Sequence, residues 1–314
     1  MQMDRRYFAK LASITAAGQL TRNLWAQKVL PTASADKFYF AVVADPHIID
    51  DFYHGHESNE LDTTSLQHSA ERLTSARDLI NSLHPKIEQV FLAGDYFHNY
   101  PSTDYDFYFK NVTRLDHAKA ITDGFQMPVH LGFGNHDYDV KNIPREMSHR
   151  LFAAKFNAKP YSVLDYKGFK FIHLNNFLGS TQDHAAADFN PGVGSLGEEQ
   201  LQWFEAQLRE NRPTFVFIHY PLLLVKPTEF GDFGLYPLLK KYQETIQLVT
   251  CGHIHMWYDF ARTYGPQHYA IAATRYDENA YMLMEVDTRK ISWKFLNADL
   301  VEWSTHYSKP YRAV

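Results

Sequence analysis

The chain has 314 residues, a formal net charge of −5, and 45% hydrophobic residues. That size allows one large domain or two small ones with an ample apolar core. The acidic balance and the lack of a Lys/Arg-rich run after the N-terminus argue against a nucleic-acid groove. The single cysteine, Cys251, excludes an internal disulfide framework, and its apolar neighbours predict an inert thiol in a buried strand.

The first residues carry an export-type pattern. Residues 4–10 read DRRYFAK, which resembles a twin-arginine export signal. The apolar stretch over 11–20 is too short to span a membrane, and Ala26 offers a small residue at a cleavage point. We therefore expect residues 1–30 to be an export signal and spacer that the twin-arginine export machinery recognises. The mature protein would then be periplasmic or otherwise extracytoplasmic. The alternative is an ordinary basic amphipathic helix.

The next hundred residues alternate strand-like runs with helical periods. Continuous apolar runs predict buried strands, and a spacing of three to four predicts amphipathic helices. The expected strands are 38–43, 87–92 and 129–131, the expected helices are 66–83 and 105–121, and an acidic loop covers 50–62. Each strand ends at a fragment that contains Asp or Asn, so polar side chains gather at the carboxyl ends of the strands, where α/β sheets carry their sites.

The second half of the chain contains shorter strands. Residues 161–166 and 169–174 flank Lys167-Gly168 and predict a hairpin, and Ser195 to Glu198 matches a capping box that starts a helix. Further strands are expected at 214–218 and 246–250, followed by short strands with turns over 257–296. No repeat and no long linker interrupts the pattern. We therefore expect one α/β domain over residues 36–314, with two stacked sheets flanked by helices.

Five short fragments along the chain contain residues that bind metals. They are Asp45-Pro-His47, Gly94-Asp95, the run GNHD at 134–137, the lone His219, and the run GHIH at 252–255. Carboxylate, amide oxygen and imidazole suit ions such as Mn, Fe or Zn. Seven ligand-type residues are too many for one ion, but they fit two ions that share a carboxylate. The usual task of such a metal pair is the hydrolysis of phosphate esters.

The order of these fragments resembles that of the calcineurin-like metallophosphoesterase superfamily, over nearly all of residues 36–300. The resemblance implies a four-layer α-β-β-α sandwich of two mixed sheets, and two divalent or trivalent ions (Mn, Fe or Zn). It also implies a role for each ligand-type residue: Asp45, His47 and His255 for the first metal, Asn135, His219 and His253 for the second, and Asp95 as the bridge. His136 would protonate the leaving alkoxide or stabilise the phosphoryl group during in-line attack by a metal-bridging hydroxide.

The residues after Asp95 narrow the subtype. Three positions after the bridging Asp, phosphoprotein phosphatases of the superfamily carry an Asp followed by Arg, and purple acid phosphatases carry an iron-binding Tyr. Here these positions are His98 and Asn99, so the pattern is closer to that of the class III cyclic-nucleotide and glycerophosphodiester phosphodiesterases. We expect a small phosphodiester or phosphomonoester as the substrate, with His98, Asn99 and Tyr138 as substrate contacts. The alternatives are a phosphoprotein phosphatase and a non-catalytic metal-binding relative.

Overall fold

The computed structural model describes residues 34–55, 57–139 and 142–307. The predicted export signal at 1–30 therefore lies outside the described residues. The strands are β1 Lys37–Val43, β2 Gln89–Leu92, β3 Val129–Leu131, β4 Ser162–Tyr166, β5 Phe169–His173, β6 Thr214–Phe217, β7 Ile246–Cys251, β8 Tyr258–Ala261, β9 His268–Ala270, β10 Tyr281–Asp287 and β11 Ser292–Phe295. The helices are α2 Glu60–Gln67, α3 Ser69–Ser82, α4 Phe107–Lys110, α5 Arg114–Thr122, α6 Asn135–Tyr138, α7 Arg145–Phe156, α8 Glu198–Leu208 and α9 Leu235–Lys241, with short 3-10 turns at Ser180–Gln182 and Leu222–Leu224.

The strands form two mixed sheets. One has the order β11-β10-β1-β2-β3, and the other has the order β4-β5-β6-β7-β9-β8. In the first sheet β1, β2 and β3 are parallel and β10 runs antiparallel to β1. In the second sheet β5, β6, β7 and β9 are parallel, and the edge strands β4 and β8 are antiparallel to their neighbours. The predicted fold class, two mixed sheets flanked by helices, is confirmed.

An aromatic layer fills the space between the two sheets. Phe38, Phe40 and Val42 of β1 face this layer, whereas the alternate residues of the strand face the helices. The Phe91 ring stacks on Phe217 at 4.4 Å between ring centroids and on Phe171 at 4.9 Å. Because both faces of β1 are covered, its sequence is a continuous apolar run rather than an alternating one.

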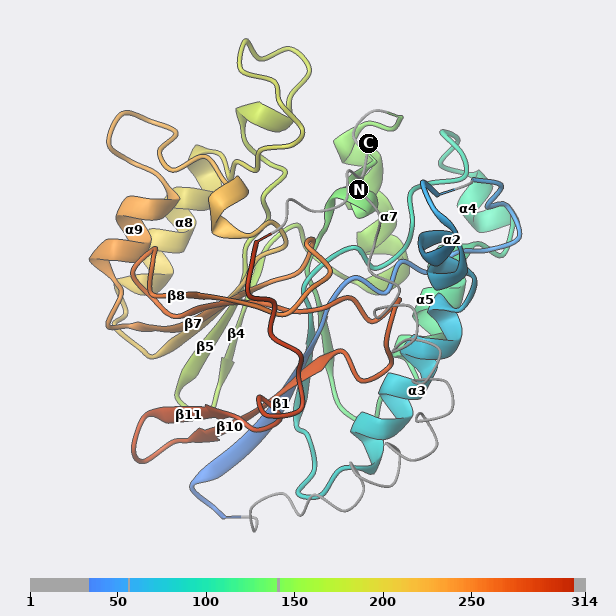
Figure 1. The fold of residues 1–314 in the computed structure, drawn as a ribbon. Coiled ribbons are helices and arrows are strands. Elements are labelled where there is room, and N and C mark those ends of the chain that lie inside the picture. Colours follow the sequence, from blue (N-terminus) through green and yellow to red (C-terminus); the bar gives the residue numbers. More distant parts are fainter. Residues whose placement is uncertain (1–33, 56, 140–141, 308–314) are drawn as a thin grey trace.

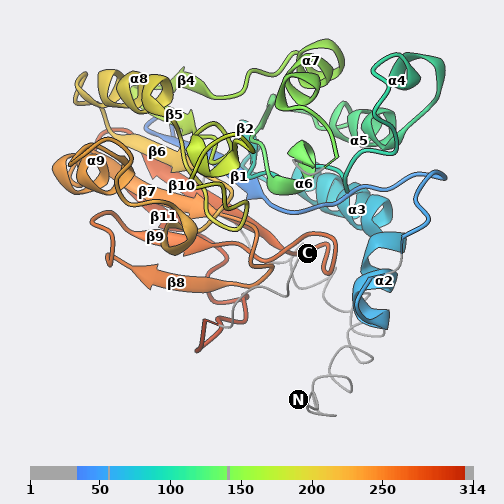
Figure 2. The ribbon, with the colours of Figure 1, turned by 90° about the horizontal axis from the view of Figure 1, so that it is seen from above.

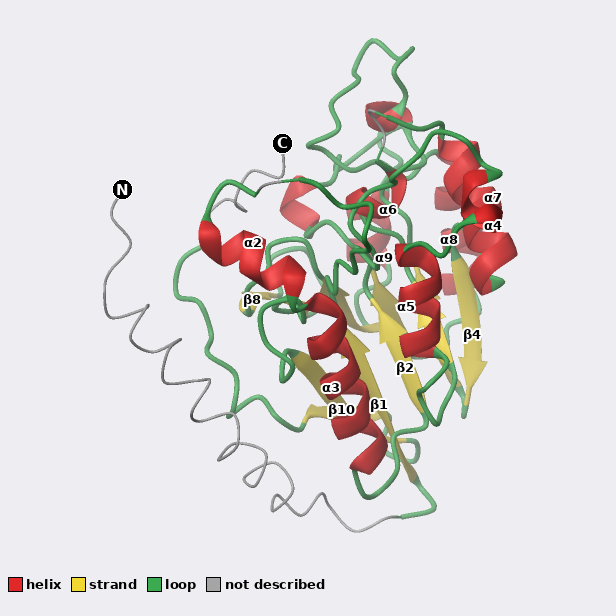
Figure 3. Ribbon diagram, turned by 90° about the vertical axis from the view of Figure 1, so that its right-hand side faces the viewer, coloured by secondary structure: helices red, strands yellow, loops and turns green. Residues whose placement is uncertain are grey.

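Helices cover the outer face of each sheet (Figures 1 and 3). Helices α3 and α5 pack beside β1 and β2, and α8 and α9 lie on the opposite side of the molecule (Figure 2). The apolar stripe of α8, formed by Leu201, Phe204 and Leu208, is fully buried. In the part of the chain that the structure describes, no helix has both the length and the apolar character needed to cross a bilayer.

Three local predictions were wrong. The helix expected at 66–83 is two helices, α2 and α3, that meet at His68. The helix expected at 105–121 is broken before Thr113, because Thr113 and Asp116 form a capping box that starts α5. The capping box expected at Ser195 does not form. The Ser195 hydroxyl instead pairs with Thr181, and Gly197 precedes the first residue of α8.

Candidate metal centre

The predicted ligands meet at the carboxyl ends of the parallel strands. Asp45 follows β1, Asp95 follows β2, Asn135 follows β3, His219 follows β6 and His253 follows β7. Among the described residues, two of the three groups whose ligand atoms all lie within 4.8 Å of one another consist of predicted ligands alone: Asp45, His47, Asp95 and His255 in the first group, and Asp95, His219 and His253 in the second. Asp95 belongs to both groups. The sandwich therefore assembles at one rim what the chain scatters over more than 200 residues.

The carboxylate of Asp95 lies between the two groups. Its Oδ2 atom is 3.4 Å from Nε2 of His47 and 3.2 Å from Nε2 of His219. Its Oδ1 atom accepts a hydrogen bond of 2.8 Å from the backbone N–H of His136. One oxygen thus faces both groups while the other is held by the backbone.

Hydrogen bonds fix how His219 presents its ring. Its Nδ1–H donates to the carbonyl oxygen of Ala93 at 2.8 Å, because a carbonyl can only accept. The other ring nitrogen, Nε2, then faces Asp95 and lies 3.1 Å from Oδ1 of Asn135. A backbone carbonyl on the far nitrogen is the usual way in which a metal-binding imidazole is oriented. Asn135 therefore joins the second group, as its position in the motif predicted.

The backbone of the site is unusual. Five of the seven predicted ligands have φ between 49° and 70°, in the left-handed region that non-glycine residues rarely adopt: Asp45, His47, Asp95, His253 and His255. Such residues cost of order 1–3 kcal/mol each and gather where the surrounding structure holds side chains for a function. Five of the twelve non-glycine residues with positive φ in the described structure are predicted ligands, and this concentration supports a functional reading of the set independently of the motif.

Two glycines let the carboxylates approach the backbone closely. A Cβ atom on Gly134 would lie 2.1 Å from Oδ1 of Asp95, and one on Gly252 would lie 2.4 Å from Oδ2 of Asp45. The Asp45 carboxylate also accepts from the backbone N–H of His253 at 3.0 Å. Glycine is needed at both positions because any side chain would occupy the space of a ligand.

The surrounding protein groups shift the pKa values of the histidines at the centre. Burial lowers the pKa of His47 and of His253 well below the ordinary histidine value. Burial also acts to lower the pKa of His219, but the neighbouring Asp95 carboxylate prevails and raises it to about 9. Two buried carboxylates beside imidazoles with inward-facing Nε2 atoms form a donor set that fits Mn, Fe or Zn. The residues present therefore fit a pair of ions that shares Asp95.

His136 stands beside the two groups rather than in them. Its Nδ1 lies 2.8 Å from Oδ1 of Asn99, its ring centroid is 4.7 Å from that of His47, and its side chain is half-buried. Burial lowers the pKa of His136 to about 3. Because an amide oxygen accepts, the ring proton sits on Nδ1 and Nε2 carries the free lone pair.

The three predicted substrate contacts lie in different surroundings. Asn99 is half-buried and orients His136. His98 is buried and lies against His47, with 3.2 Å between their Nδ1 atoms. Tyr138 is buried, and its hydroxyl lies 2.8 Å from Nε2 of His149 and 2.6 Å from the amide nitrogen of Asn175. The Tyr138 hydroxyl is therefore already paired with protein groups, and we do not propose it as a substrate contact.

Sequence reasoning missed the polar residues that support the centre. Asp137 is fully buried and accepts from the backbone N–H of Tyr96 at 2.9 Å and of Gly134 at 2.8 Å, so it ties two ligand loops together. Its place in the run GNHD was the available signal. Arg275, which is also buried, lies 3.3 Å from Asp62, and nothing in its local sequence marked it.

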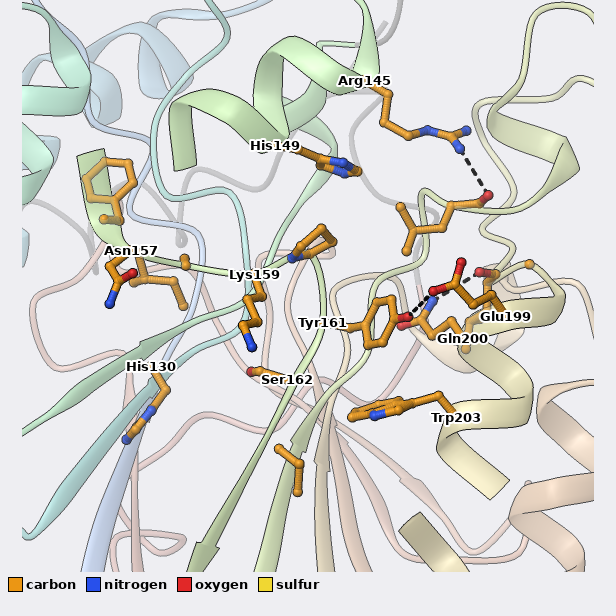
Figure 4. Close-up of a pocket in the computed structure, with 18 of the residues that line it drawn as sticks. His130, Arg145, His149, Asn157, Lys159, Tyr161, Ser162, Glu199, Gln200 and Trp203 are labelled. Atoms are coloured by element: carbon orange, nitrogen blue, oxygen red, sulfur yellow. Dashed lines mark hydrogen bonds between the residues drawn. The ribbon is translucent and has the colours of Figure 1, made fainter. Parts of the chain in front are cut away.

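A large cavity in the described structure lies elsewhere (Figure 4). It has a volume of about 1000 Å³ and is bounded by β3, β4, α7 and α8. Lys159, Tyr161 and Trp203 are among its lining residues, whereas none of the seven predicted ligands lines it. One contact between the cavity and the loop that carries Asn135 and His136 runs from His149 to Tyr138, at the end of α6.

Comparison with solved structures shows a shared fold. The chain resembles a dimetal phosphatase from Danio rerio with 18% identity and a TM-score of 0.55, covering 79% of this chain and 92% of that one. A purple acid phosphatase from yellow lupin (Lupinus luteus) has 14% identity and a TM-score of 0.46, with 85% of this chain and 54% of that one covered. For an NAD nucleotidase from Haemophilus influenzae the values are 12%, 0.43, 87% and 65%. The chain thus spans about half to two thirds of the last two proteins.

No curated protein matches the sequence significantly. The family model described as calcineurin-like phosphoesterase matches residues 38–257, which contain every predicted ligand together with His136. The matched segment is more than two thirds of the chain. The chain therefore belongs to the calcineurin-like phosphoesterase family and is a metal-dependent phosphoric ester hydrolase.

Proposed function

We propose that the protein is an exported binuclear-metal phosphoesterase that hydrolyses small phosphate esters. The observation that carries the proposal is the position of Asp95, whose single oxygen Oδ2 faces His47 and His219 at 3.4 and 3.2 Å. Asp45, His47 and His255 would hold one ion, Asn135, His219 and His253 the other, and Asp95 would bridge them. Two such ions, when bound, activate water as the nucleophile and neutralise charge on the phosphoryl oxygens.

The protein side chains would position the ester for reaction. His136 is half-buried at the rim of the centre, and Asn99 holds its Nδ1–H. Its Nε2 is therefore the atom that would carry a proton to the leaving oxygen, a transfer typically worth about 10²–10⁴ in rate. Because burial disfavours the charged imidazole, the negative charge of a bound ester would support protonation at Nε2. The half-buried side chains of Asn135, His253 and His255 leave the centre open to a small substrate on the same side.

Bound ions would supply most of the positive charge at the centre, and the protein adds little unpaired positive charge of its own. Besides burial, the positive charge of Arg275 lowers the pKa of His47, His98 and His136. Its guanidinium already faces Asp62 at 3.3 Å and contacts the Tyr276 hydroxyl. Beyond the charge of the two ions, little positive charge is left for the second negative charge of a monoester, so we expect a singly charged diester to be the better substrate.

A panel of esters tests the proposal once the metal content has been measured. We expect kcat/KM to be higher for bis(4-nitrophenyl) phosphate than for 4-nitrophenyl phosphate, two esters with the same leaving group. Faster turnover of the monoester would assign the protein to the monoesterases. Two bound ions with no turnover of any ester in the panel would identify the non-catalytic relative instead.

A phosphoprotein phosphatase is the second enzymatic reading. It is disfavoured because His98 and Asn99 stand where those enzymes carry Asp and Arg, and because both residues already have partners within the protein. A phosphorylated peptide in the same panel tests this reading directly. Turnover of the peptide above that of the small diester would favour it.

Export rests on the sequence pattern alone. The paired Arg5 and Arg6 form an address that is read by a receptor. We expect Arg5→Lys/Arg6→Lys to hold the protein in the cytoplasm, as measured by fractionation of expressing cells. Unchanged export of the double variant would show that this segment is an ordinary N-terminal helix.

A further inference from the structure

A chain of buried polar contacts leads outward from the first metal group. His47 faces that group with Nε2 and faces away from it with Nδ1. The Nδ1 atom of His98 lies 3.2 Å from Nδ1 of His47. On the other side of the His98 ring, Nε2 lies 3.3 Å from Oε1 of Glu57, which also accepts a hydrogen bond of 2.7 Å from the Tyr53 hydroxyl.

The proton positions along this chain follow from its two ends. If Nε2 of His47 binds an ion, it carries no proton, so Nδ1 of His47 is the donor. Nδ1 of His98 must then accept, which places the proton of His98 on Nε2. That Nε2–H points at the carboxylate of Glu57, which can only accept. Every nitrogen and oxygen along the line is thereby matched as a donor or an acceptor, with one proton at each link.

The surroundings hold the chain in place. His98 is 5% exposed, its backbone N–H donates to Ile48 at 3.0 Å, and Arg114 donates to its carbonyl oxygen. The Tyr53 ring meets the His98 ring edge-on at 5.4 Å. A neutral imidazole beside an ionised carboxylate is the arrangement that the donor and acceptor pattern requires.

We propose that Glu57 and His98 are positioning residues for the metal ligand His47, with the carboxylate acting through two imidazoles in series. The carboxylate fixes the tautomer of His98, and His98 then fixes the tautomer and ring orientation of His47. Partners of this kind raise the basicity of the ligand and tighten the ion that it binds. The sequence predicted that His98 contacts the substrate. In this proposal it instead acts on the first metal through the ligand His47.

The second group is supported differently. His219 donates its Nδ1–H to the neutral carbonyl oxygen of Ala93. The carboxylate relay serves only His47, so its loss should weaken one ion and spare the other. This asymmetry separates a relay from a general structural role, which would affect both ions together.

A competing arrangement uses the same atoms. His47, His98 and His136 also form a group within 4.8 Å, so a third ion is the alternative occupant of this space. It would need His47 to bind ions through both ring nitrogens. Counting the ions therefore decides between the two arrangements.

The test measures metal affinity, because the inference rests on the two-metal centre of the proposed function. Purified full-length protein is loaded with Zn²⁺ and dialysed against graded concentrations of a competing chelator, and its metal content is then measured. We expect Glu57→Ala and His98→Ala to bind two ions at saturation and to release one of them at about 10–100-fold lower chelator strength. Glu57→Gln, which keeps an acceptor but loses the charge, should fall between wild type and Glu57→Ala.

The exposed pair of His68 and Glu71, 3.1 Å apart, provides the matched control. Glu71→Ala should retain both ions as wild type does. If Glu57→Gln and Glu57→Ala both release their ions at the same chelator strength as wild type, Glu57 does not affect metal affinity and the relay is wrong. A third ion that disappears in His98→Ala would overturn it as well. A wild type that binds fewer than two ions would instead overturn the two-metal centre itself, so the two failures are distinguishable.

Discussion

The metal centre and the large cavity differ in how their polar groups are arranged. The cavity is roomy, but the charged and polar groups around it pair with one another. Tyr161 donates to Glu199 at 3.0 Å, and Arg145 donates to the Leu178 carbonyl at 3.0 Å. Its left-handed residue Asn157 is an ordinary helix end. The metal centre is small, with strained backbone and with carboxylates and imidazoles that face inward. Converging donors on a strained backbone mark the candidate catalytic site here, whereas volume does not.

The largest expected effect is the loss of the shared carboxylate. Asp95→Asn leaves a neutral amide between the two groups, so both ions should bind more weakly. Loss of proton transfer alone would lower the rate by about 10²–10⁴-fold. We expect kcat/KM for a diester to fall by more than that. Metal analysis and kinetics on the same preparation check this result. Retention of one tightly held ion at the wild-type level would show that Asp95 does not bridge.

The next effect separates chemistry from metal binding. His136→Ala should keep both ions and lower kcat by about 10²–10⁴-fold, because only the proton transfer is removed. The loss should be larger for esters with high-pKa leaving groups than for a nitrophenyl ester, which leaves without protonation. Equal losses for both kinds of ester would favour charge stabilisation by His136, and parallel loss of metal would favour ligation.

A backbone substitution should affect one group only. The Cβ of Gly252→Ala would fall on Oδ2 of Asp45, and relief of such overpacking typically costs about 1–3 kcal/mol. We expect weaker binding of one ion and an activity that added metal partly restores. Gly192→Ala is the control, because its Cβ would meet only Asn190 at 3.4 Å. Equal behaviour of the two variants would remove the argument for a close fit around Asp45.

The smallest effect belongs to the cavity. Lys159→Ala and Trp203→Ala change its charge and its aromatic wall without touching a predicted ligand. We expect kcat/KM for small diesters to stay within about twofold of wild type, since surface changes away from a site are usually worth less than about 0.5 kcal/mol. A tenfold loss in either variant would bring the cavity into the catalytic site and end the contrast.

Much of the centre was predictable because its ligands lie in short contiguous fragments. The pairs Asp45/His47 and His253/His255 are each two residues apart and directly follow an apolar strand, so the sequence alone reveals them. The supporting residues could not be found in this way. Glu57 meets His98 only after the acidic loop folds back, so no local spacing records the contact.

The fold itself was predictable at the level of strands and layers. Continuous apolar runs marked β1, β2, β6 and β7 because both faces of each sheet are covered. Helix boundaries were less accessible. The break before Thr113 depends on a reciprocal side-chain bond with Asp116, and the Ser195 signal failed because a distant partner, Thr181, takes its hydroxyl. Competing tertiary partners decide such cases, and a sequence window does not contain them.

The two sheets contribute to both metal groups. Asp45 and His47 leave the first sheet and meet His255 from the second, while His219 and His253 of the second sheet meet Asp95 of the first. Bound ions would join the two sheets at one rim of the sandwich, where the rings of Phe91 and Phe217 also stack between the sheets. Ion binding would then stabilise the contact between the two sheets at that rim. Phe217 lies two residues before His219 in the chain, so a change in the aromatic layer would shift a residue that we propose to hold the second ion.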